Sequence, residues 1–143
     1  MKYLSPYKIA VYLLALFFAG HTLGGMISQK SMGASSDAVF DSMKAVHFDF
    51  NGADSTWYGF WFGFGLLASV FLLFSVVVTW QLDKVGKENW HAVSTIAWAF
   101  AASHLATAVL SWAYFFAGPG VVSTLVTLLL GVGVLRKQRA NAS

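Results

Sequence analysis

Four long apolar stretches, joined by polar connections, occupy almost all of this 143-residue chain. A helix needs about 20 predominantly apolar residues to cross a bilayer, so four such helices and their connections use up the whole length. Only 10% of the residues are charged and 57% are hydrophobic, whereas a soluble domain carries roughly 25% charged residues. We therefore predict an all-α membrane protein, a four-transmembrane-helix bundle formed by one domain over residues 1–143.

The predicted spans cover about residues 6–28, 56–82, 89–116 and 119–135. Pro6 falls in the first turn of its helix, where proline is tolerated. No small-x-small cleavage site closely follows the first stretch, so we expect it to stay as a span rather than to be removed as a signal peptide. The fourth span begins at Pro119 after a tight turn over residues 117–120, ends before Arg136, and is expected to be the shortest.

The distribution of basic and aromatic residues predicts the orientation. If the N-terminus is cytoplasmic, that side holds Lys2, Lys8, Lys84, Lys87, Arg136, Lys137 and Arg139, and the outer side holds Lys30 and Lys44. Aromatic residues that mark the inner interface are Tyr3, Tyr7, Trp80 and Trp90, and those that mark the outer one are Trp57, Tyr58, Trp61, Trp112 and Tyr114. Both signals place the two termini on the cytoplasmic side of a bacterial inner membrane.

Several function classes are disfavoured by what the chain lacks. There is no cysteine, which excludes disulfides and thiolate metal sites. The net charge of +3 comes from residues at the ends of apolar stretches, and no basic block with interleaved aromatics indicates a nucleic-acid partner. Apart from Lys8 near the start of the first span, the predicted spans contain no aspartate, glutamate, lysine or arginine, and they show no convincing inverted repeat, which argues against a transporter. Phosphate loops, nucleotide fingerprints and nucleophile elbows are absent.

The first outer connection, residues 29–55, is the one extended polar region. Ser35 and Ser36 are expected to cap a helix. Apolar residues then recur at helical spacing at Val39, Phe40, Met43 and Val46. This pattern predicts a short amphipathic helix that lies in the membrane interface. Residues 47–52 alternate polar and aromatic side chains, which is consistent either with polar groups directed inward over a lipid-anchored face or with a simple connector that has a glycine turn.

Two histidines, His21 and His104, lie inside the first and third predicted spans. At 1.5 Å per residue, His21 lies about 22 Å along its helix from Pro6, and His104 about 21 Å from Trp90. These helices run in the same direction, so we expect both rings in the outer half of the membrane. Ionisable residues in a span are expensive and usually face a bundle interior, which makes this pair the best pointer to function.

Several interpretations of the pair remain open. Each ring could serve packing alone through an interhelical hydrogen bond. The histidines could instead hold the polar head of an amphipathic ligand, a quinone or an isoprenoid or sterol-like lipid. In an enzyme of this kind, one of His21 and His104 would be the general base and the other the general acid, and Asp49 would orient one of the two rings. Further candidate ligand-binding residues are Thr22, His47, Tyr58, Trp61, Thr107 and Ser111.

Metal and partner hypotheses are also open. His21 and His104 could ligate a b-type haem, since matched depth and adjacent glycines suit it. A non-haem metal could bind the set His21, His47, Asp49 and His104, although this spacing is no known signature. The chain could also be a homo-oligomer or an accessory subunit of a larger membrane complex, because its aromatic-rich second span could pack against a protein as well as against membrane lipid. Neither the ligand nor a cofactor is fixed by the residues.

Small residues predict where helices approach closely. Gly20 with Gly24, and Gly59 with Gly63, form Gly-xxx-Gly pairs. Gly131 and Gly133 make the fourth span locally narrower, because glycine has no side chain. Packing is the favoured interpretation, because this motif occurs often by chance in glycine-rich spans.

Four segments carry a resemblance: Gly20–Gly24 (Gly-His-Thr-Leu-Gly), His47–Gly52 (His-Phe-Asp-Phe-Asn-Gly), the aromatic run 57–65, and Trp80-Gln81-Leu82 at the end of the second span. Together they resemble a family of small bacterial four-helix integral membrane proteins whose activity is uncharacterised. The similarity covers the first two spans and their connection best. It implies the four-helix fold and a site that includes His21, Thr22, His47, Asp49 and Tyr58, and it transfers no mechanism. His104 lies outside the resembling part.

Overall fold

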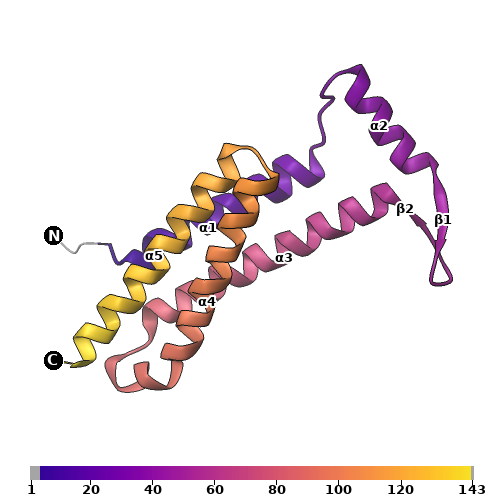
Figure 1. Cartoon of the computed structure of the whole chain (residues 1–143). Helices are drawn as coiled ribbons and strands as arrows, with labels where there is room; N and C mark the ends of the chain where they lie inside the picture. The colour runs from indigo at the N-terminus through magenta and orange to yellow at the C-terminus, as the bar shows by residue number, and fades with distance from the viewer. Residues whose placement is uncertain (1–3, 143) are drawn as a thin grey trace. The chain divides into compact units, whose positions relative to one another are not determined.

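The computed structural model describes residues 4–142. Along the chain these form the helices α1 (Pro6–Ala19), η1 (Gly20–Ile27) and α2 (Ala34–Ala45), the strands β1 (His47–Phe50) and β2 (Ala53–Thr56), and the helices α3 (Trp57–Lys84), α4 (Lys87–Tyr114) and α5 (Ala117–Ala142) (Figure 1). Four helical segments, of which α1 with η1 is the first and α3, α4 and α5 are the others, are long and apolar enough to cross a membrane. The predominantly helical class and the prediction of four helices able to cross a membrane are thereby confirmed. Lys2 and Tyr3, used above for orientation, lie outside the described residues.

The described residues divide into two compact units. The helical unit comprises residues 4–17 and 72–142, and the hairpin unit comprises residues 18–71. The border crosses α1 and α3, so each of these helices contributes one part to each unit. Each unit has its own polar contacts and is described by itself.

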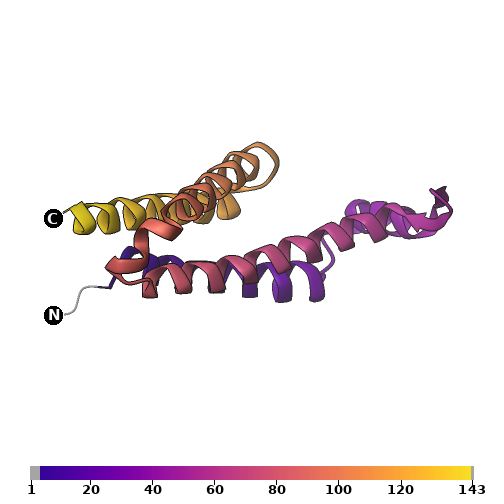
Figure 2. The ribbon, with the colours of Figure 1, turned by 90° about the horizontal axis from the view of Figure 1, so that it is seen from below.

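In the helical unit, α4 and α5 pack along one another and are joined at Phe115–Phe116 (Figures 1 and 2). The predicted tight turn over residues 117–120 is wrong, because these residues form the first turn of α5. Pro119 is accommodated there because first-turn N–H groups have no intrahelical acceptor to lose. The helix α5 continues past Arg136 to Ala142, and its apolar segment of 25 residues is longer than the first candidate span of 22 residues. Charged residues end a membrane crossing, but arginine and lysine are good helix formers.

The core of the helical unit contains Tyr7, Ala10 and Leu14 from α1 and Val126, Leu130 and Val134 from α5, all nearly inaccessible to solvent. A Cβ atom added at Gly133 would lie 2.7 Å from the Tyr7 ring, while at Gly131 it would meet open space. Of the two glycines expected to thin the fourth span, Gly133 therefore makes the close approach.

In the hairpin unit, α2 covers the segment in which the sequence predicts a short helix, but the predicted serine caps are wrong. Gly33 occupies the N-cap with φ +102°, and Ser35 lies inside the helix with Ser36. The Asp37 carboxylate instead holds the preceding connection, accepting from the Ser31 hydroxyl at 2.6 Å and from the Met32 N–H at 3.3 Å.

The segment after α2 is an antiparallel β-hairpin, with His47 opposite Thr56 and Phe50 opposite Ala53. Its turn residues, Asn51 and Gly52, both have positive φ. This is the turn geometry for which an Asn-Gly pair is the strongest short-range signal. Of the two interpretations given for residues 47–52, the connector with a glycine turn matches the observed backbone.

The helix η1 is a π-helix of eight residues, Gly20–Ile27. Such helices are rare, and their short forms are frequent at functional sites. Within the hairpin unit, a Cβ atom added at Gly20, Gly24 or Gly63 would meet nothing within 4 Å. At Gly59 an added Cβ would lie 3.2 Å from Oγ1 of Thr56, the residue just before α3, so the close contact there is local and neither Gly-xxx-Gly pair brings a second helix close within this unit. The close approach occurs at Gly65, where an added Cβ would lie 2.2 Å from the end of the Met26 side chain.

Candidate functional site

His21 makes the most informative contact of the hairpin unit. From the π-helix its ring reaches α3, with Nε2 2.9 Å from the carbonyl oxygen of Gly65. A carbonyl oxygen can only accept, so Nε2 carries the proton and donates it. In the neutral ring, Nδ1 is then a lone-pair acceptor. No contact to this nitrogen is found among residues 4–142, and the side chain is half-buried.

Neighbouring groups complete the arrangement around Gly65. The Thr22 hydroxyl donates to Ser69 Oγ at 2.9 Å, and Ser69 donates to the Gly65 carbonyl oxygen at 3.3 Å. Met26 packs on Gly65, where the absent side chain leaves room for it. We call these five residues the histidine clasp. The clasp ties η1 to α3, and His21 Nδ1 is the acceptor that it leaves unused.

Aromatic side chains continue the same face of α3 toward its start. Trp61 and Tyr58 precede Gly65 by four and seven residues, which places all three on one side of a helix. Phe40 of α2 contacts both rings edge-on, with centroids 5.1 Å from Trp61 and 6.5 Å from Tyr58. The Tyr58 hydroxyl hydrogen-bonds with the Gln29 amide at 3.1 Å. The clasp is therefore continuous with an aromatic surface that has a polar edge.

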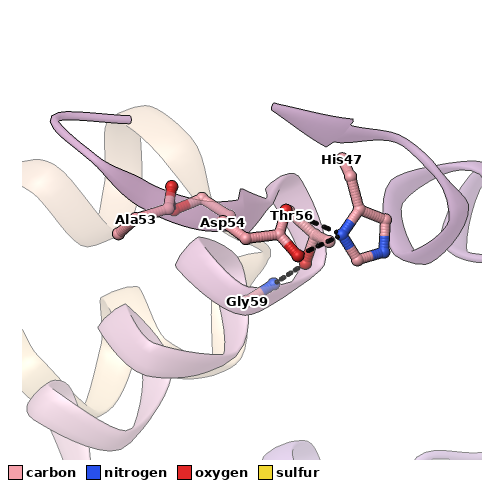
Figure 3. A network of polar contacts seen from close by, with 6 residues as sticks. His47, Ala53, Asp54, Thr56 and Gly59 are labelled. Atoms are coloured by element: carbon pink, nitrogen blue, oxygen red, sulfur yellow. Dashed lines mark hydrogen bonds and ion pairs between the residues drawn. The ribbon is translucent and has the colours of Figure 1, made fainter. Parts of the chain in front are cut away.

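His47, a predicted ligand-binding residue, is on the surface of the hairpin (Figure 3). Its Nδ1 lies 2.9 Å from Asp54 Oδ1, and the two side chains are 59% and 73% exposed. Asp49, the predicted orienting residue, accepts from the Gly52 N–H at 3.1 Å and so closes the turn. The carboxylate that meets His47 is thus that of Asp54, which the sequence reasoning did not single out.

The base of the hairpin leads directly into α3. Thr56 Oγ1 accepts from the Gly59 N–H at 3.0 Å, which is an N-cap hydrogen bond (Figure 3). Beside it lies an open, mostly apolar groove of about 450 Å³ between α2 and the first residue of α3, lined by Ala38, Val39, Ser42, Met43, Val46 and Trp57. Trp57 precedes Gly65 by eight residues, about 12 Å along the helix. The groove and the histidine clasp are therefore separate features.

His104 belongs to the helical unit and has different surroundings. Its side chain is 2% exposed, its Nε2 lies 3.2 Å from the Ser75 hydroxyl, and Phe100 packs edge-on against its ring at 4.7 Å. A histidine with these contacts is enclosed by the interior of its unit. The two histidines thus belong to different units.

The other two predicted residues of α4 make contacts within the helical unit. Thr107 donates to the Ser103 carbonyl oxygen of its own helix at 3.0 Å. Ser111 and Ser123 share a buried hydroxyl–hydroxyl hydrogen bond of 3.3 Å between α4 and α5. The Thr107 hydroxyl therefore finds its hydrogen-bond acceptor within its own helix, whereas the Ser111 hydroxyl links α4 to α5.

Metal-binding capacity follows from these contacts. Among residues 4–142, no three histidine, cysteine or acidic side chains gather as a metal-binding group would. His21 Nε2 is engaged with a backbone carbonyl, so a metal ion could reach this ring only through Nδ1. A carbonyl partner of this kind is the usual orienting contact of a ligating histidine.

Comparisons of the chain with protein-family models, with curated proteins and with solved structures find no match. The function must therefore be argued from the site.

Proposed function

We propose that this protein binds an amphipathic ligand, a quinone or an isoprenoid or sterol-like lipid, at the histidine clasp. The observation that carries the proposal is the half-buried His21, which lies within a candidate membrane span. Its Nε2 donates to the Gly65 carbonyl oxygen, and its Nδ1 remains available as an acceptor. A polar atom in hydrocarbon is costly unless it finds a partner. The hydroxyl of a sterol, isoprenol or quinol is such a partner, and it can donate to Nδ1.

The ligand's apolar part would lie along the face of α3 that runs from Gly65 of the clasp toward the start of the helix. That face carries Trp61 and Tyr58, flat side chains that suit rings and isoprene units. Thr22 follows His21 in the chain, and its hydroxyl group adds a second polar group near the ligand head. The chemistry required of the protein is binding and orientation. His21 Nδ1 is also the group that would accept a proton if the ligand is transformed.

The proposal includes a topology. The helical unit carries Lys84, Lys87, Arg136, Lys137 and Arg139 where α3 ends, α4 begins and α5 ends. Placing this end in the cytoplasm of a bacterial inner membrane satisfies the positive-inside rule. A cytoplasmic N-terminus then places η1 and the start of α3, and with them the histidine clasp, in the outer half of the membrane, with α2 in the outer interface.

Native mass spectrometry of the protein released gently from its own membrane tests this proposal. His21→Gln is the informative variant, because a glutamine amide can still donate to the Gly65 carbonyl but offers no imidazole Nδ1. We expect a bound small-molecule mass on the wild-type chain and its loss from His21→Gln. His91→Gln makes the same chemical change at an exposed position of α4 and should retain the mass.

Two results would contradict the proposal. A wild-type chain that carries no small molecule, or only another polypeptide, would favour packing histidines and an accessory role in a larger complex. Retention of the same ligand by His21→Gln would show that Nδ1 does not hold it.

A further inference from the structure

A small hollow lies at the end of the helical unit where the basic residues gather. It has a volume of about 90 Å³ and is lined by Val85 and Gly86 of the α3–α4 connection, Lys87 and Trp90 of the first turn of α4, and Lys137 and Asn141 of the last turns of α5. We call it the basic hollow. It belongs entirely to the helical unit and takes no part in the function proposed above.

The indole of Trp90 points to a missing acceptor. This side chain is 2% exposed, and its Nε1 has no hydrogen-bond partner among the described residues. A buried donor without an acceptor costs about 1–3 kcal/mol. Trp90 lines the basic hollow, so an acceptor placed there is a candidate to satisfy it.

Lys137 brings a cation to the same place. Its Nζ donates to the carbonyl oxygens of Asp83 at 3.0 Å and Val85 at 2.6 Å and lies 5.6 Å from the centre of the Trp90 ring. An ammonium group has three N–H donors, so two of them are used by the backbone and one remains. Trp90, which carries an unpartnered indole N–H, and Lys137, which keeps one N–H unused by these carbonyls, therefore both line the basic hollow.

The start of α4 adds a third source of positive potential. Its N-cap is Gly86, and no side chain caps the helix. The first N–H groups of a helix attract anions through the helix dipole. Lys87 adds a full charge at the same turn. The nearby acid is Glu88, whose carboxylate lies beside Gly86, while the Asp83 carboxylate accepts from the Ser5 hydroxyl.

We propose that the basic hollow binds the phosphate group of an anionic phospholipid. The volume is about three times the roughly 30 Å³ that a water molecule occupies, which suits one phosphate group and not a whole ligand. Uncapped helix N–H groups, two lysines and an indole N–H together match the acceptor oxygens of a phosphate. Basic pockets between helices at the cytoplasmic side of a membrane are where such headgroups bind.

Titration of the purified full-length protein with dioleoylphosphatidylglycerol, followed by native mass spectrometry, tests this site. Dioleoylphosphatidylcholine serves as the zwitterionic reference. We expect the anionic lipid to bind more tightly, and Trp90→Phe to weaken it about tenfold, since a hydrogen bond to a charged group is lost. Trp80→Phe removes the indole of an exposed tryptophan near the end of α3 and should leave affinity unchanged.

A second pair of variants keeps the test decisive if Trp90→Phe folds poorly. Lys87→Gln changes an exposed side chain of the basic hollow and should weaken the anionic lipid about fivefold, and Lys84→Gln, whose ammonium lies over the Trp80 ring, is its control. Glu88→Gln should strengthen binding by removing a nearby negative charge. Equal affinity for the two lipids, or wild-type affinity in both Trp90→Phe and Lys87→Gln, would overturn the proposal.

Inorganic phosphate separates a lipid from a soluble source. If an excess of it displaces the anionic lipid, the phosphate group is the recognised element, as proposed. If it fails to compete while the anionic lipid stays bound, recognition extends to the lipid. Binding of inorganic phosphate with no retention of the anionic lipid would contradict the lipid assignment.

Discussion

The two membrane histidines differ in what their surroundings leave available. His104 is enclosed by the helical unit and contacts Ser75 and Phe100. His21 is half-buried in the hairpin unit, and one ring nitrogen is held by a backbone carbonyl while the other has no contact among the described residues. Sequence alone makes the two residues equivalent, as ionisable groups inside spans. Their contacts make one of them a packing residue and the other a candidate for ligand binding.

This contrast teaches that a histidine in a membrane span is not a functional residue by itself. An enclosed ring with a hydroxyl partner is stable without a ligand. A ring that is fixed through one nitrogen, with no contact to the other among the described residues, resembles the oriented histidines of binding sites. Variants of either ring, or of the residues packed around it, test this difference between the two histidines.

The largest expected effect is on stability. His104→Ala removes a buried side chain and leaves Ser75 without its partner, so we expect a loss of about 3 kcal/mol in the free energy of unfolding. Thermal unfolding in detergent measures it, and His91→Ala, at an exposed position, should change little. Ligand retention per folded molecule should stay at the wild-type level. Loss of the ligand without destabilisation would reverse the roles assigned to the two histidines.

A smaller loss is expected from overpacking the helical unit. Gly133→Ala would place a methyl group 2.7 Å from the buried Tyr7 ring, whose rigid atoms cannot move aside, and should cost about 2 kcal/mol. Gly131→Ala is the matched control, because an added Cβ meets open space there. Equal unfolding temperatures for the two variants would mean that α1 and α5 do not pack in this way.

Much of the fold could be predicted because long apolar runs admit few structures. The second and third spans were placed within two residues of α3 and α4. The helix α5 continues beyond the predicted span because Arg136 stops the apolar run without stopping the helix. The π-helix was not predicted. It differs from an α-helix in which carbonyl oxygen each N–H group binds, and this difference has no simple sequence pattern.

The hairpin turn offers a prediction of intermediate size. Gly52→Ala introduces a side chain at φ +84°, where an L-residue is strained, and should cost about 1 kcal/mol of local stability. Amide hydrogen exchange of β1 and β2 measures it. Gly63→Ala, in an open position of α3, should be neutral or slightly stabilising, because alanine is the better helix former. Unchanged exchange in Gly52→Ala would argue against the Asn-Gly turn.

The smallest effect is expected at the exposed ion pair of the hairpin. Asp54→Asn removes the charge that faces His47, and exposed pairs of this kind contribute at most about 1 kcal/mol. The same exchange measurement should show a slight loss that added salt reduces. Asp49→Asn, which keeps an oxygen for the Gly52 N–H, is the control. A loss as large as that of His104→Ala would show that this pair supports more than the hairpin.

The candidate site was only partly predictable. His21 and Thr22 were identified because polar residues stand out in an apolar run. Gly65 and Ser69 were not, since a carbonyl acceptor and a serine on a neighbouring helix have no sequence signature. Asp54 was passed over in favour of Asp49, although the Asn51-Gly52 turn pairs their two strands so that Asp54 lies near His47.

Nitrogen NMR of the histidine rings tests the central claim most directly. With ¹⁵N-labelled histidine and the His21 signals assigned from His21→Gln, we expect a neutral ring protonated at Nε2. Returning the native ligand to delipidated protein should then shift the Nδ1 signal of His21 and leave that of His104 in place. A His21 ring protonated at Nδ1, or signals that do not respond to the ligand, would contradict the account.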